Sequence, residues 1–363
     1  MSQQTSSPQS SVSLTDLPIE TMRAIAILLL VSFHVIGGNT ADGLGLSYPH
    51  PLRYFADLLV NIRMPFFAFV AGAVYALRPV EPSQLGKFQI GKLRRLAIPG
   101  LTAITIFILF TWLTGGGLPF DGEFWQAYYR GYAIFWFLQA MLLFFLIFGT
   151  ADILTRGQIL LPALLVAFAA LGSGSTFETD ILAANRISFL FAYLLLGIAY
   201  VRYHHVFRAY RGPVLALAAL ALLMGLGMTL NILLESDALP RSHLGLRSLL
   251  LASGSCLLTF MLLPHLRSLD WLGGFSLTIY LYHILATSAT RRVLDTAGTD
   301  SLILHVLLGT LAGVAAPLIL HLVMSQWSLT RLLFLGLKPR AHQPRRRVAV
   351  TALPVHAAMQ RID

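Results

Sequence analysis

Two basic side chains in the first apolar stretch of the sequence have a spacing that places them on one face of a helix, where they could take part in a reaction. Arg23 and His34 stand eleven positions apart. That is close to three α-helical turns, so both lie on one helix face, about 16 Å apart along its axis. Ionisable groups inside an apolar helix are costly and indicate a functional site, so we expect Arg23 and His34 to face one shared hydrated cavity and not the lipid. Because a histidine titrates near neutral pH, His34 is the candidate for proton transfer.

Other ionisable residues interrupt later apolar stretches. Arg63 lies in the second stretch and His283 in the ninth, and His305 and His321 stand near the two ends of the last one. If neighbouring helices run antiparallel, Arg63 and His283 reach the depth of His34. Three costly groups in one layer predict a polar chamber. The alternative is that each is solvated separately near the outer face.

Arg23 and His34 also have purely structural interpretations. Arg23 could be an interface anchor whose aliphatic stem lies in apolar surroundings, paired with Glu20 one turn earlier. His34 could be a packing histidine that forms a hydrogen bond to a neighbouring helix. Neither interpretation excludes a functional site.

The composition predicts that helices in a membrane position these residues. Of 363 residues, 56% are hydrophobic and 12% are charged, against roughly 25% charged in soluble domains, and the mean hydropathy is +0.72. A bilayer core requires about 20 apolar residues per helix. We therefore expect an all-α polytopic membrane protein with about ten transmembrane helices. The apolar runs are 19–38, 56–77, 96–113, 133–150, 159–171, 187–201, 214–234, 246–263, 271–287 and 302–324.

The basic residues predict the orientation. With a cytoplasmic N-terminus and ten spans, seventeen Lys and Arg fall in inner connections and the inner tail and seven in outer connections, as the positive-inside rule requires. The net charge of +10 thus needs no nucleic-acid partner. We expect one membrane domain, 19–337, between disordered tails, 1–18 and 338–363. The single cysteine, Cys256, excludes an internal disulfide and a multi-cysteine metal site, and no metal cofactor is expected.

Five sequence blocks resemble the acyltransferase-3 family of membrane O-acyltransferases. They are MRAIAILLLVSFHVIGG (22–38), RMPFFAFVAG (63–72), KLRRLAIPG (92–100), FWFLQAMLLFF (135–145) and LGGFSLTIYLYHI (272–284). They occur in the order and spacing of the family, and the nearest branch is the sugar or fucose O-acetyltransferases. Ala71 departs from the pattern, because the family usually has a serine there.

The resemblance implies transfer of an acyl group, usually acetyl, from acyl-CoA to a carbohydrate hydroxyl. Lys92, Arg94 and Arg95, beside Arg23, would bind the phosphates of coenzyme A. His34 would act as general base, or would carry the acyl group transiently, and Arg63 would stabilise the oxyanion. The residues expected to contact substrate or to support this site are Trp136, Gln139, Tyr280 and His283.

Three readings of the function remain open. A carrier or flippase for a sugar-containing or lipid-linked substrate is the main alternative, although acidic residues, which ion-coupled carriers use, are almost missing from the runs. A non-catalytic membrane subunit that binds a partner is a third. For the enzyme, we expect a bacterial inner-membrane location, contact with membrane lipid, and a carbohydrate or glycolipid acceptor.

Overall fold

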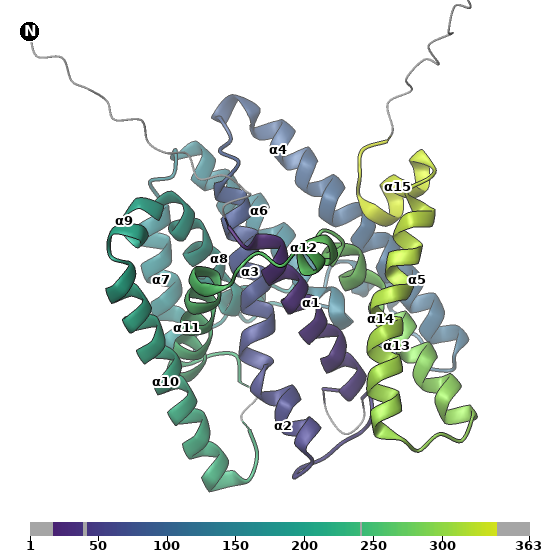
Figure 1. Ribbon diagram of the computed structural model, residues 1–363. Coiled ribbons are helices and arrows are strands. Elements are labelled where there is room, and N and C mark those ends of the chain that lie inside the picture. The colour runs from purple at the N-terminus through teal and green to yellow at the C-terminus, as the bar shows by residue number, and fades with distance from the viewer. Residues whose placement is uncertain (1–16, 39–41, 240–241, 340–363) are drawn as a thin grey trace, which may run out of the picture.

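The computed structural model describes residues 17–38, 42–239 and 242–339, and the chain in these ranges is a bundle of helices (Figure 1). Within them no β-strand forms, apart from an isolated bridge between Arg130 and Ile181. The all-α prediction is confirmed. The two predicted tails, 1–18 and 338–363, fall almost wholly outside the described residues.

Each of the ten predicted apolar runs coincides with a helix. These are α1 (Ile19–Ile36), α3 (Val60–Ala76), α5 (Ile98–Leu113), α6 (Trp136–Leu154), α7 (Leu160–Ser173), α8 (Ala184–Arg202), α10 (Arg211–Ser236), α11 (Leu246–Leu262), α13 (Ser276–Thr296) and α14 (Leu302–Met324). Five shorter helices connect or extend them within the described ranges. They are α2 (Pro51–Leu58), α4 (Leu85–Lys92), α9 (His204–Ala209), α12 (Arg267–Gly273) and α15 (Ser328–Leu335).

Length and hydropathy show which helices can cross a bilayer. In the described chain, seven helical segments are long and apolar enough, and α7 and α11 are apolar but shorter. The α10 segment is the clearest case of a lipid-facing helix, because only 17% of its most apolar window is buried. Exposed leucines along it, among them Leu217, Leu223 and Leu234, give it an apolar surface that suits contact with lipid. The protein is therefore an integral membrane protein.

Small residues bring the central helices together. A Cβ on Gly72 of α3 would overlap the Leu194 carbonyl of α8, and a Cβ on Gly197 of α8 would overlap the Phe69 carbonyl of α3. This reciprocal contact allows two backbones to touch, as small residues do in membrane helix pairs.

Helix α1 lies in the middle of the bundle, in contact with α3, α12, α13 and α14 (Figure 1). On α14, Gly309 and Gly313 leave room for Val35 and Val31 of α1, and Gly273 of α12 packs on the backbone of Glu20. Because α1 is enclosed in this way, the polar residues on it face other helices and not only lipid.

The bundle has two distinct ends. Helices α4 and α15 lie at one end, and α2 and the connection between α13 and α14 lie at the other (Figure 1). Since α1 runs from the first end to the second, we call them the Arg23 end and the His34 end.

Candidate active site

A cavity of about 700 Å³ lies at the Arg23 end. Its basic lining residues are Arg23, Arg78, Lys92 and Arg95, and its acidic ones are Glu20 and Asp270. Arg23 Nη1 donates to Glu20 Oε1 at 2.7 Å, so the predicted pairing of these two residues forms while Arg23 still faces the cavity. Arg95 Nη1 donates to the Leu335 carbonyl at 2.9 Å, which ties the cavity wall to α15. The cavity therefore has an excess of positive charge.

The predicted basic cluster at residues 92–95 is divided by the backbone. The α4 helix continues into α5 through a π-helical turn, Leu93–Ala97, which changes the direction in which successive side chains point. Lys92 and Arg95 line the cavity, whereas Arg94 is not among its lining residues. Lys92 Nζ lies 3.3 Å from the centre of the Phe145 ring, a cation–π contact. Ala71 also lines this cavity, at the position where the family usually has a hydroxyl.

A second cavity, of about 430 Å³, lies at the His34 end. Its polar and aromatic lining residues include His34, Trp136, Tyr280, Arg291, Arg292, His305 and Asp42. It adjoins a more open vestibule that shares Arg291, Arg292 and His305 and adds Asp295. Arg23 and His34 thus line two different cavities, one at each end of α1, and not a single chamber.

Tyr280 is the residue that the two cavities share. It appears in the lining of both cavities while its side chain is only 3% exposed. Its hydroxyl donates to the Ile134 carbonyl, and its ring packs against Phe137 at 5.6 Å between ring centres. The hydrogen bond and the ring contact hold Tyr280 between the two spaces.

The three groups expected in one layer lie close together around Phe33. The His34 and His283 rings are 5.1 Å apart between their centres. The Arg63 guanidinium lies 3.4 Å from the centre of the Phe33 ring, and the Phe33 and His34 rings pack at 5.1 Å between their centres in a T-shaped arrangement. Arg63 and His283 are buried and do not line the cavity, so the three groups lie near one another but do not form the predicted polar chamber.

The other two predicted site residues of this region lie in different surroundings. Trp136 lines the His34 cavity, with the Arg186 guanidinium 4.9 Å from the centre of its ring. Gln139 lines neither the cavity at the Arg23 end nor the cavity at the His34 end. Its Nε2 donates to the Ala127 carbonyl at 3.1 Å, and it lines a separate small space of about 70 Å³.

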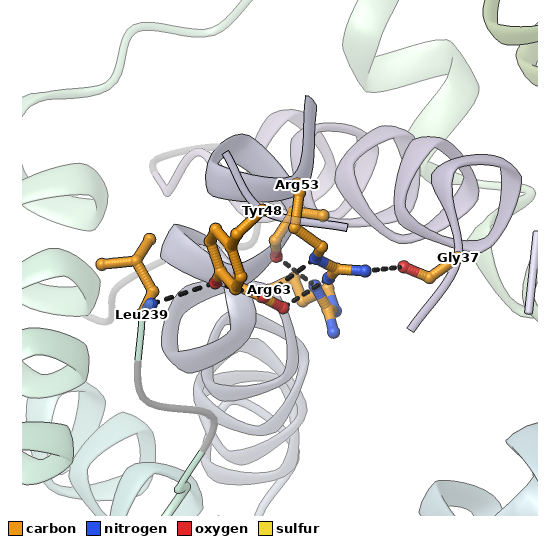
Figure 2. A network of polar contacts seen from close by, with 7 residues as sticks. Gly37, Tyr48, Arg53, Arg63 and Leu239 are labelled. Atoms are coloured by element: carbon orange, nitrogen blue, oxygen red, sulfur yellow. Dashed lines mark hydrogen bonds and ion pairs between the residues drawn. The ribbon is translucent and has the colours of Figure 1, made fainter. Parts of the chain in front are cut away.

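A buried ion pair that the sequence analysis missed fixes the His34 end (Figure 2). Arg53 is 1% exposed, donates from two nitrogens to the Asp57 carboxylate, and donates to the Gly37 carbonyl at 2.7 Å. It therefore holds the chain directly after α1. The i, i+4 spacing of Arg53 and Asp57 in the sequence is the signal that could have revealed this pair.

The same carboxylate connects this network to the segment after α10. Tyr48 Oη donates to Asp57 Oδ2 at 2.6 Å and accepts from the Leu239 amide at 3.0 Å (Figure 2). Burial, followed by the hydrogen bond to Asp57, raises the pKa of Tyr48 to about 12. Tyr48 therefore remains a hydrogen-bond donor throughout the physiological pH range.

A residue set suitable for a metal does not occur in the described ranges, where no group of three His, Cys, Asp or Glu side chains gathers.

The fold and the two cavities define a polytopic, all-α membrane protein with a basic cavity at one end and a histidine-containing cavity at the other. A family model described as an acyltransferase domain, that of the acyltransferase-3 family, matches residues 17–322. The chain belongs to this family of membrane acyltransferases. No curated protein and no solved structure matches the chain.

Proposed function

We propose that the protein transfers an acyl group, most simply acetyl, from acyl-CoA in the Arg23 cavity to a carbohydrate hydroxyl in the His34 cavity. One observation carries this proposal: a basic cavity and a histidine-lined cavity meet at a single side chain, Tyr280. A donor and an acceptor entering from opposite ends would bring their reacting groups together there.

The charge of the Arg23 cavity favours coenzyme A as the carrier of the acyl group. Coenzyme A carries several phosphate charges, and Arg78, Lys92 and Arg95 offer cationic donors on one wall. The positive-inside rule would place this cavity on the cytoplasmic side, where acyl-CoA is made. In a bacterium, the corresponding location is the inner membrane.

The chemistry proposed for His34 is general-base catalysis. His34 takes the proton of the acceptor hydroxyl as its oxygen attacks the thioester carbonyl carbon. The tetrahedral intermediate collapses, the carbon–sulfur bond breaks, and the departing thiolate receives the proton from His34. The positive charge of Arg63, one ring away behind Phe33, favours negative charge on the carbonyl oxygen in this water-poor region.

The lining of the His34 cavity suits a carbohydrate acceptor. The Trp136 ring offers an apolar face to the carbon–hydrogen face of a sugar, and Arg291 and His305 offer polar groups to its hydroxyls. The vestibule next to it leaves room for the remainder of a polymer or glycolipid.

The test is His34→Ala in the full-length protein. Membranes supplied with radiolabelled acetyl-CoA, and mass spectrometry of surface glycans from cells with and without the protein, report acyl transfer. We expect transfer to fall by on the order of 100-fold or more while the amount of protein in the membrane is unchanged. His205→Ala, at an exposed histidine of α9, is the matched control. Full activity of His34→Ala would refute the assignment, and glycan movement without acylation would identify a carrier instead.

A further inference from the structure

We infer that His283 is a positioning residue, which holds the His34 ring in the one tautomer that can accept a proton from the acceptor. The inference rests on the proposed function for its catalytic consequence. Its structural half is the tautomer of His283, which contacts within α13 fix, and the nearness of the His34 ring on α1, and it can be tested without any acyl transfer.

The bonding of His283 determines where its proton sits. Its Nδ1 lies 3.0 Å from the Ile279 carbonyl and 2.9 Å from the Tyr280 carbonyl. Carbonyl oxygens can only accept hydrogen bonds, so Nδ1 must carry the hydrogen. In the neutral ring, Nε2 is then a lone-pair acceptor, and its direction is fixed by the backbone of α13.

That acceptor has no partner. The His283 side chain is fully buried, and Nε2 makes no hydrogen bond within the described structure. A buried polar atom left in this way costs roughly 1–3 kcal/mol. The orphan atom indicates a donor that arrives in another state of the protein.

His34 is the donor within reach. Its ring lies 5.1 Å from the His283 ring, centre to centre, at an angle of 49°, and no hydrogen bond joins the two. A rotation of the His34 side chain closes this gap, since catalytic hydrogen bonds are often long in a ligand-free protein and shorten when substrate binds. The other elements packed here bring one charged group near the pair, Arg63 of α3, and it is already stacked on Phe33.

The packing around His283 seals the pair from lipid. A Cβ on Gly313 of α14 would collide with Val31 of α1 and Thr287 of α13, and would stand 3.9 Å from the His283 Cβ. Because α14 carries glycine there, it packs directly over the place where α1 and α13 meet. The two imidazoles are thus enclosed on one side, while His34 opens to its cavity on the other.

The consequence for catalysis follows from the donor and acceptor roles. When one His34 nitrogen donates to His283 Nε2, the other nitrogen presents its lone pair to the cavity. His34 then takes the hydroxyl proton and keeps its bond to His283 as an imidazolium. Neutral His283 fixes the His34 ring but adds no negative charge that would stabilise the protonated form of His34. The proton therefore passes readily from His34 to the departing thiolate.

Two substitutions separate positioning from packing. In His283→Gln the amide reaches the place of Nε2 and can still accept from His34, whereas in His283→Asn it reaches only the place of Nδ1. We expect kcat to fall about 10–100-fold in His283→Asn and only a few-fold in His283→Gln. The KM for acyl-CoA should not change, because the donor cavity is separate. His321→Gln is the matched control, since this histidine bonds Thr278 at 2.8 Å and lines neither large cavity.

A spectroscopic experiment tests the tautomers without acyl transfer. In ¹⁵N-histidine-labelled protein, we expect the His283 ring to be protonated on Nδ1 and His34 to populate one tautomer, which becomes a mixture in His283→Asn. If acyl transfer is absent but these spectra hold, the proposed function fails and the pairing stands. A His283 ring protonated on Nε2, or wild-type kcat in folded His283→Asn, would overturn the inference.

Discussion

Buried charge at the His34 end shows how single residues shape the site. Arg53 and Asp57 neutralise each other within one helical turn, and their remaining hydrogen bonds reach Gly37 and Tyr48. A buried pair of this kind adds little net stability, but removing one partner leaves an uncompensated charge. We therefore regard it as a device that fixes the end of α1, and with it His34, in one position.

His243 is the residue in this region whose titration should affect stability. It stacks on Phe189 at 4.5 Å between ring centres and lies 3.4 Å from Asn61 Oδ1. Burial, followed by the positive charges of Arg63, Arg186 and Arg247, lowers the pKa of His243 to about 4. The folded protein therefore favours the neutral form of the His243 side chain.

The first prediction is a pH dependence of stability caused by His243. Between about pH 6.5 and pH 4 the unfolded chain binds more protons than the folded protein, so the free energy of unfolding falls as the pH is lowered. The slope from this group approaches about 1.4 kcal/mol per pH unit. In detergent, His243→Gln should show a shallower loss than the wild-type protein, measured by thermal unfolding at several pH values. If the stability of the wild-type protein and of His243→Gln falls in parallel as the pH is lowered, His243 is not the group responsible.

At the scale of elements, the π-helical turn decides which basic side chains reach the Arg23 cavity. Four successive residues of the sequence, Lys92 to Arg95, carry three positive charges. Sequence spacing does not distinguish Arg94 from Arg95, yet only Arg95 of these two lines the cavity. An inserted residue in a helix rotates everything that follows it.

The second prediction compares these two neighbours. Arg95→Gln should raise the KM for acyl-CoA about 10-fold, because one charge-assisted hydrogen bond to a phosphate contributes roughly 1.5–3 kcal/mol. Arg94→Gln should change it less than about 2-fold. Initial rates at varied acyl-CoA, at low and high salt, measure both. Equal effects of the two substitutions would restore the grouping predicted from sequence.

The contact between α3 and α8 is the second feature at this scale. Gly72 and Gly197 each face a backbone carbonyl of the opposite helix, so not even a methyl group fits.

The third prediction is that Gly72→Ala lowers the free energy of unfolding by about 3 kcal/mol or more. Gly227→Ala is the control, because a Cβ there meets nothing within 4 Å, and it should change stability by no more than about 1 kcal/mol. Thermal unfolding and the yield of monodisperse protein measure the effect of each substitution. Equal stability of the two variants would contradict the prediction.

Across the whole molecule, the decisive feature is the partition between the two cavities. The cavities have volumes of about 700 Å³ and about 430 Å³, and the Tyr280 ring stands between them with its hydroxyl bonded to Ile134. A partition that excludes water would protect the thioester until an acceptor is bound.

The fourth prediction concerns this partition. Tyr280→Ala should join the cavities and raise the ratio of acyl-CoA hydrolysis to acyl transfer by on the order of tenfold, or about 1.4 kcal/mol in relative barriers. Tyr280→Phe keeps the ring and should stay near the wild-type ratio. Free thiol released by purified protein without acceptor measures hydrolysis. If Tyr280→Ala releases no additional thiol, the ring does not separate the two spaces.

The sequence by itself determined the class of fold, the location of the helices and the family. Each of these depends on local properties of the sequence. Long apolar runs must be helical in a bilayer, because no water is present there to form hydrogen bonds with the backbone. The motif blocks are contiguous, so the family can be identified without the tertiary structure. It also placed Arg23 and His34 on the helix that proves to be central.

Only the tertiary structure decided how the polar residues are divided. It placed Arg23 and His34 in separate cavities, separated Arg94 from Arg95, and left Gln139 out of the lining of both cavities. The physical reason is that apolar helices have little amphipathic pattern to mark their inner face. Which face points inward is therefore determined by contacts between distant segments, such as Gly313 against Val31.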